Sequence, residues 1–153
     1  PPTSNPQEIA LGFTPIFWNT ACTQHQAPHT LGILCDPAHP ALASFPTDAH
    51  TNWQWWHLVT RAAVMKLDTL PPALRPLVQV IDDWFTNRRL GLVFEARVGP
   101  GRLLVCSIDL TGDLDDQPVA RQLRASLLAY AGSDRFNPSE SVSLEALQPV
   151  LAG

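Results

Sequence analysis

The stretch LGLVFEARVGPGRLLVCSIDL, residues 90–110, decides the fold. Two β-rich runs, Leu90–Val98 and Arg102–Leu110, are joined by the three residues 99–101, which include two glycines. A short Gly-containing link between two such runs is typical of a β-hairpin. The second run is apolar at nearly every position, as expected for a strand that is covered on both faces. The stretch therefore predicts an antiparallel pair inside a layered α/β domain.

Side chains alternate along the first of these runs, so we expect two distinct faces. Glu95 and Arg97 share one face, which predicts an ion pair between them. The other face is expected to carry the apolar residues Leu92, Phe94, Ala96 and Val98.

The clearest helix follows this hairpin. Pro118 suits the first helical position, whose amide needs no partner, and Gly132 is placed to end the helix. Between them, Val119, Leu123, Leu127 and Tyr130 recur at helical spacing. A second helix is predicted between His50 and Ala63, with Thr51 or Asn52 as its cap, and further strands are predicted at Leu31–Cys35, Val64–Asp68 and Leu77–Ile81.

Composition excludes several classes of protein. The chain has 153 residues, of which 45% are hydrophobic and 16% charged, so it is long and apolar enough to form a core. A net charge of −4 provides no basic field for nucleic acid or an anionic membrane. The apolar runs are too short to span a bilayer. The start at Pro1 shows neither a signal peptide nor an initiator Met, which suggests a cut point or a processed terminus.

Five segments together resemble a known group of proteins. The hairpin at 90–110, followed by PVARQL at 118–123, resembles the end of glutamine-amidotransferase-like domains, as does CDPAHPALASFPT at 35–47. With HTNWQWW at 50–56 and VQVIDDW at 78–84, the pattern is similar to the C-terminal region of bacterial glycoside hydrolase family 2 proteins.

The resemblance covers residues 12–138, leaving 1–11 as a linker or cut point and 139–153 as a C-terminal tail. It implies a three-layer α/β fold of the class I glutamine-amidotransferase-like (flavodoxin-like) type. The sheet would be mostly parallel, with a C-terminal antiparallel hairpin. It also implies an accessory domain that packs against the other domains of a periplasmic or extracellular glycosidase, or helps it to form a homo-oligomer.

The sequence predicts no catalytic residue. Amidotransferase chemistry needs a cysteine on a strained elbow flanked by small residues, and neither Cys35 nor Cys106 has the necessary glycines. Ser107 fails the same test as an esterase nucleophile. Glycosidase chemistry needs two opposed carboxylates, whereas Glu95 has Arg97 beside it.

Neither a metal nor a cofactor is predicted. Five cysteine and histidine residues lie within eighteen positions, but their spacing matches no zinc knuckle or finger. They are Cys22, His25, His29, Cys35 and His39. The three cysteines do not suggest a disulfide framework, because Cys35 and Cys106 both lie in apolar runs.

A tryptophan cluster is the main candidate for binding. Trp53, Trp55 and Trp56 follow His50, and sugars commonly stack their apolar faces on aromatic rings. On a helix, Trp53 and Trp56 would share a face while Trp55 points elsewhere. The cluster therefore allows core or inter-domain packing, saccharide contact, or an oligomer interface.

A second candidate surface lies where the strand at 77–81 should end. Asp82, Trp84 and Asn87 occupy this position, and ligands of open α/β sheets bind at such strand ends. The leading hypothesis is a non-catalytic accessory domain. The alternative is a carbohydrate-binding module that uses the tryptophans with His50 and Asp82, and an independent esterase-type hydrolase is the third.

Overall fold

A computed structural model describes residues 9–14 and 26–151. In this part of the chain, five strands form one sheet in the order β1-β3-β4-β2, with β5 also paired to β4. All pairings between these strands are antiparallel. The predicted mostly parallel, three-layer amidotransferase-like (flavodoxin-like) sheet is therefore wrong. The strands are β1 (Thr30–Cys35), β2 (Met65–Lys66), β3 (Val78–Asp82), β4 (Leu90–Val98) and β5 (Gly101–Cys106).

Strand β4 is the centre of the sheet. Its residue Gly91 pairs with Met65 of β2 on one edge and with Gln79 of β3 on the other. A Cβ atom on Gly91 would lie 2.9 Å from Leu67 Cδ1 and 3.0 Å from Pro76 Cβ, so a side chain does not fit there. The second half of β4 pairs with β5, which confirms the predicted hairpin. Its second strand ends at Cys106 rather than at the predicted Leu110, and Gly101 pairs with Val98, so the link is residues 99–100.

A β-bulge changes which face of β4 each side chain reaches. Val78 pairs with Val93 and Gln79 with Gly91, so Leu92 is the extra residue on β4. Leu92 consequently packs in one core cluster, whereas Phe94 and Ala96 pack in the other. The prediction that these three side chains share a face is wrong. The extra residue at the bulge shifts the alternation of side chains between the two faces of the sheet by one position.

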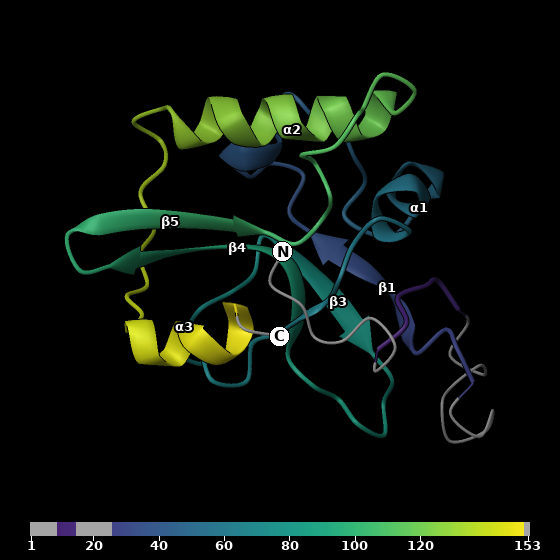
Figure 1. Ribbon diagram of the computed structural model, residues 1–153, viewed down its shortest axis with the longest axis horizontal. Coiled ribbons are helices and arrows are strands. Elements are labelled where there is room, and N and C mark those ends of the chain that lie inside the picture. Colours follow the sequence, from purple (N-terminus) through teal and green to yellow (C-terminus); the bar gives the residue numbers. More distant parts are fainter. Residues whose placement is uncertain (1–8, 15–25, 152–153) are drawn as a thin grey trace.

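Helices cover both faces of the sheet (Figure 1). One face packs against α1 (Trp53–Val59), the 3-10 helix η1 (Pro40–Leu42) and α2 (Pro118–Ala131). The other face packs against α3 (Leu144–Leu151), which buries Leu147 and Val150. Double coverage explains why β4 is apolar on both sides although its neighbours are antiparallel.

The helix ends follow local rules. Pro118 occupies the first turn of α2, and the Gly132 N–H donates to the carbonyls of Leu128 and Tyr130, as the sequence predicts. In α1, Asn52 Oδ1 accepts from Gln54 N at 3.0 Å and from Trp55 N at 3.3 Å. This N-cap confirms the predicted start of the helix, although α1 is shorter than the predicted 50–63.

The segment 9–14 lies beside the start of β1. His29 N donates to Ala10 O at 2.8 Å, and Gly12 N donates to Thr30 Oγ1 at 3.0 Å. Ile9 is buried in the core. None of the helices described for this chain is long and apolar enough to cross a membrane.

Candidate functional site

Trp55 is a core residue. Its side chain is fully buried and packs edge-on against Phe45, with ring centroids 5.5 Å apart. Its indole Nε1 donates to Thr47 Oγ1 at 2.7 Å, which satisfies the one polar atom of the ring. Trp55 therefore anchors α1 to the sheet and is not available to a ligand.

Trp53 and Trp56 lie at the surface on one side of α1, as their spacing predicts. Trp53 is 83% exposed and Trp56 is 41% exposed. Their ring centroids are 6.4 Å apart and their planes cross at 69°. Phe13 packs edge-on against Trp56 at 5.6 Å. The rings form an angular aromatic patch, and one flat ligand cannot stack on both.

The loop between β3 and β4, which we call the aromatic loop (residues 83–87), exposes a second aromatic pair. Trp84 is 60% exposed and Phe85 is 64% exposed. Their ring centroids are 5.6 Å apart at an angle of 85°. The sequence singled out Trp84 but missed Phe85, which is its immediate neighbour in the same polar run.

Asp83 holds the aromatic loop in one conformation. Its buried carboxylate accepts from Phe85 N at 2.9 Å, Thr86 N at 3.0 Å and Thr86 Oγ1 at 2.7 Å. The Asn87 N–H donates to Asp83 O at 2.9 Å, so the loop forms one helical turn with Asp83 as its cap. Asn87 ends the turn with φ at 52°, a conformation that asparagine tolerates.

Asp82 is not free to bind a sugar. It is buried and accepts two bonds from the Arg88 guanidinium, at 2.8 Å from Nε and 2.9 Å from Nη2. Arg88 N donates to the same carboxylate at 2.8 Å. His50 is exposed and forms an isolated antiparallel bridge with Leu34 of β1, so its backbone borders the sheet.

A series of contacts near the start of β1 connects the two exposed aromatic pairs. The segment 9–14 contacts Trp56 through Phe13 and bonds to Thr30, the first residue of β1. Thr30 in turn pairs with Asp82, which directly precedes the aromatic loop. Figure 1 shows α1 at the upper right, the start of β1 at the right and the β3–β4 loop at the bottom. We call Trp53, Trp56, Trp84 and Phe85 the aromatic end.

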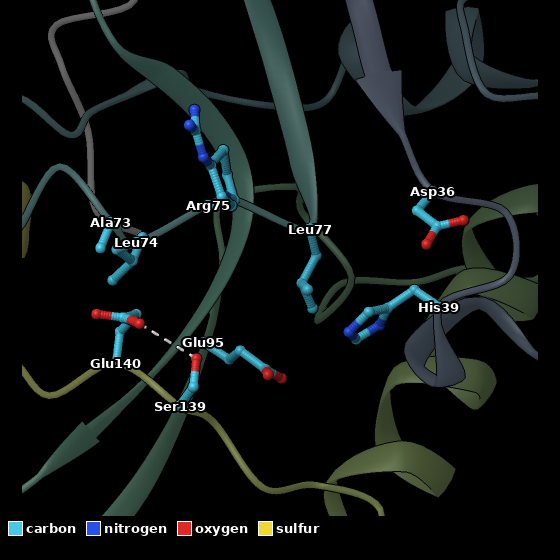
Figure 2. Close-up of a pocket in the computed structure, with 10 residues that line it drawn as sticks. Asp36, His39, Ala73, Leu74, Arg75, Leu77, Glu95, Ser139 and Glu140 are labelled. Atoms are coloured by element: carbon cyan, nitrogen blue, oxygen red, sulfur yellow. Dashed lines mark hydrogen bonds between the residues drawn. The ribbon is translucent and has the colours of Figure 1, made fainter.

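A cavity of about 280 Å³ lies beyond the C-terminal end of β1 (Figure 2), lined by apolar side chains and by several charged and polar ones, and we call it the polar cavity. It is bordered by the turn after β1, the segment before β3, the middle of β4 and the chain ahead of α3. Its lining residues are Asp36, His39, Ala73, Leu74, Arg75, Pro76, Leu77, Glu95, Ser139 and Glu140.

The cavity has a fixed hydrogen-bond pattern around His39 and Glu95. His39 Nδ1 accepts from Ala41 N at 3.2 Å, and the ring packs edge-on against Tyr130 at 5.5 Å. The Tyr130 hydroxyl donates to Glu95 Oε2 at 2.7 Å. Burial and the adjacent Glu95 carboxylate raise the pKa of Tyr130 above its usual value.

Sequence reasoning missed this arrangement because Glu95 was expected to pair with Arg97. Arg97 instead donates to Pro138 O at 2.7 Å and to Asn137 Oδ1 at 2.8 Å. The chain ahead of α3 therefore supplies the partner of Arg97, and Glu95 is left for Tyr130. Nothing in the local pattern of β4 indicates either partner.

The candidate nucleophiles Cys35, Cys106 and Ser107 lie in environments that do not activate them. Burial raises the pKa of the Cys35 thiol to about 11, with help from Asp36 and Asp48. Burial likewise raises the pKa of Cys106 to about 11, and both thiols are free. Ser107 is buried, and its hydroxyl donates to Leu92 O at 3.3 Å. These groups are poorly ionised or enclosed, so they are weak nucleophiles.

Only some of the five cysteine and histidine residues that were considered as zinc ligands lie within the described part of the chain. Cys22 and His25 lie outside the described residues. His29 Nδ1 accepts from Ala10 N at 3.0 Å, which uses that nitrogen in a backbone contact. Within residues 9–14 and 26–151, no group of three or more His, Cys, Asp or Glu side chains is arranged to hold a metal ion.

The comparison with known families gives one match. The model of a family described as Domain of unknown function (DUF8487) matches residues 1–152. The chain belongs to this family. No curated protein matches the chain.

Proposed function

We propose that the chain is an interaction domain whose aromatic end docks onto the apolar surface of another folded protein domain. The observation that carries this proposal is the exposure of four large aromatic side chains, which form one pair on α1 and one pair on the aromatic loop. Exposed apolar patches of this kind mark interaction sites, because leaving them in water is unfavourable.

The size of the aromatic end suits the centre of a protein interface. Trp and Phe side chains each bury about 150–250 Å² when enclosed, so the exposed fractions amount to roughly 250 Å² for each of the two pairs. A standard interface buries about 800 Å² on each partner. Trp is among the residues that dominate binding energy at interface centres, while polar residues form the rim.

Rigid backbone supports the same proposal. Asn52 caps α1, and buried Trp55 fixes the helix against the sheet. Asp83 fixes the aromatic loop through three hydrogen bonds. Side chains on backbone that is already ordered lose less conformational entropy on binding, so the contact costs less free energy.

The partner is defined here by its chemistry. The glycoside hydrolase parent and the periplasmic or extracellular location came from a resemblance that also implied a parallel sheet. The antiparallel sheet removes the structural basis of that resemblance. Both therefore stay hypotheses, and the proposal requires only an apolar surface on a separate domain.

Carbohydrate binding is the second candidate function. The observation that favours it is Trp53, whose ring is 83% exposed and able to stack on one sugar. The 69° angle between Trp53 and Trp56 disfavours an extended chain of sugars across both rings. Asp82 is engaged by Arg88, so it does not supply the expected hydroxyl contact.

Site-specific photocrosslinking in the source cells tests the proposal. A benzoylphenylalanine placed at Trp53 or at Trp84 is expected to crosslink to one contiguous surface of another domain, identified by mass spectrometry. The same residue at Arg121, exposed on α2, is the control. Crosslinks no stronger than this control, or crosslinks only between copies of the chain, would overturn the proposal.

Tryptophan fluorescence separates the two candidates. The chain is titrated with galactosides, glucuronides and plant-wall oligosaccharides. No saturable shift is expected if the partner is a protein. A saturable shift that is lost in Trp53→Ala, but kept in Trp84→Ala, would replace the proposal with a carbohydrate-binding function.

A further inference from the structure

The polar cavity has an excess of negative charge. Three carboxylates line it, from Asp36, Glu95 and Glu140, against the single guanidinium of Arg75. Figure 2 shows the Arg75 side chain pointing away from these carboxylates. The Nδ1 atom of His39 is already occupied by the N–H of Ala41. The cavity thus favours a positively charged ligand.

Glu95 is the carboxylate best placed to meet that ligand. Figure 2 shows the Glu95 side chain and the His39 ring pointing toward each other into the cavity. Within the described residues, Tyr130 is the one hydrogen-bond donor to Glu95, and it uses Oε2. The contact orients the carboxylate and leaves Oε1 to accept from a ligand.

Apolar side chains complete the cavity wall. Leu77 points between Glu95 and His39, and buried Leu74 lies on the same segment. A volume of about 280 Å³ is slightly below the ~300–1,000 Å³ of pockets for drug-sized ligands. The cavity therefore matches a small molecule with one charged group and a short hydrocarbon chain.

We propose that this cavity binds a small organic cation, an ammonium or guanidinium group on a short alkyl chain. The cationic group donates hydrogen bonds to Glu95 Oε1, while the alkyl chain packs against Leu77. This inference is independent of the aromatic end, and so it stands or fails separately from the proposed interaction.

Titration with n-butylammonium chloride, followed by two-dimensional amide NMR, tests the inference. Saturable shifts are expected at the amides of Glu95, Ala41 and Leu77. The uncharged 1-butanol and the anionic butyrate are the matched ligands, and both are expected to bind at least about tenfold more weakly. Equal shifts with 1-butanol would show that charge plays no part and would overturn the proposal.

Two variants make the test specific. Glu95→Gln keeps the shape and an acceptor for the Tyr130 hydroxyl, so it should fold, and it is expected to weaken butylammonium binding about tenfold. Glu145→Gln, on the exposed side of α3, removes the same charge outside the cavity and is expected to leave affinity unchanged. Equal affinity in both variants, or no saturable shift in the wild-type chain, refutes the proposal.

The same cationic group can come from a free amine or from a lysine side chain of another protein. Nα-acetyl-lysine amide distinguishes these sources, because it presents the butylammonium group on a peptide unit. Binding about tenfold weaker than that of butylammonium assigns the cavity to free amines. Equal or tighter binding assigns it to a protein lysine, and neither outcome depends on the aromatic end.

Discussion

Replacing Asp83 with alanine should loosen the aromatic loop while leaving the core intact. The Asp83 carboxylate is buried and accepts from two backbone N–H groups and from the Thr86 hydroxyl. Alanine offers none of these acceptors. The bond from Asn87 N to Asp83 O, which involves only the backbone, would remain.

The expected cost follows from those bonds. Loss of an N-cap side chain costs about 0.5–2 kcal/mol, and loss of one further hydrogen bond costs about 1 kcal/mol. Asp83→Ala should therefore reduce the free energy that holds the loop closed by about 2 kcal/mol. Asp83→Asn keeps one acceptor oxygen for the backbone and caps nearly as well as aspartate, so it should cost about 1 kcal/mol or less.

Amide hydrogen exchange measures this effect directly. The Asn87 amide is the reporter, because its bond to Asp83 O closes the turn. A cost of 2 kcal/mol corresponds to an increase in exchange of roughly 30-fold in Asp83→Ala. An increase below about threefold, or equal increases in the alanine and asparagine variants, would refute the assignment of Asp83 as the cap.

Three further predictions concern the core and its titratable groups. Trp55→Ala should destabilise the chain by about 3–5 kcal/mol in urea unfolding. Trp53→Ala should change the free energy of unfolding by no more than about 0.5 kcal/mol, and similar costs for the two variants would contradict the assigned burial. The pKa of Tyr130, the one tyrosine of the chain, is raised in the folded state. Its contribution to stability is therefore fully present below the unfolded pKa of about 10 and is lost as pH rises beyond it. Ultraviolet titration should show tyrosinate appearing only above that pH, and a midpoint at or below 10 would disprove the Tyr130 contact. Cys35 and Cys106, each with a pKa of about 11, should alkylate about 200-fold more slowly at pH 8 than a free cysteine, as mass spectrometry of their peptides would show.

Local signals predicted the elements that local chemistry determines. The hairpin at 90–106 follows from its Gly-containing link, and α2 follows from Pro118, the helical spacing of its apolar residues and Gly132. The Asn52 cap of α1 was found in the same way. In each case the deciding interactions lie within a few residues of one another.

Strand direction was not predictable in this way. An apolar run such as the middle of β5 indicates a strand covered on both faces, and parallel sheets are the usual context for it. Here the second cover is α3, which forms from a segment expected to be a tail. The bulge at Leu92 has no local signal either, because it depends on the register between β3 and β4.

Whether a candidate residue was assigned correctly from the sequence also depended on how far away its contact partners lie along the chain. Helical spacing correctly separates Trp55 from Trp53 and Trp56, but it does not say which side of α1 faces the sheet. The roles of Asp82 and Glu95 depend on Arg88 and Tyr130, which approach through loop geometry and tertiary packing. Polar residues whose partners lie on other elements are therefore the ones that sequence reasoning misassigned.

The geometry also predicts that the two candidate sites are energetically separate. The aromatic loop follows Asp82, which pairs with Thr30 at the start of β1, and the polar cavity borders Asp36 just after the end of β1. At ~3.3 Å per residue these positions are about 20 Å apart. Perturbations this far apart usually add without coupling. Asp83→Ala should therefore leave butylammonium affinity unchanged, and Glu95→Gln should leave crosslinking from position 84 unchanged. A change of more than about threefold in either cross-measurement would instead mean that β1 transmits strain between its ends.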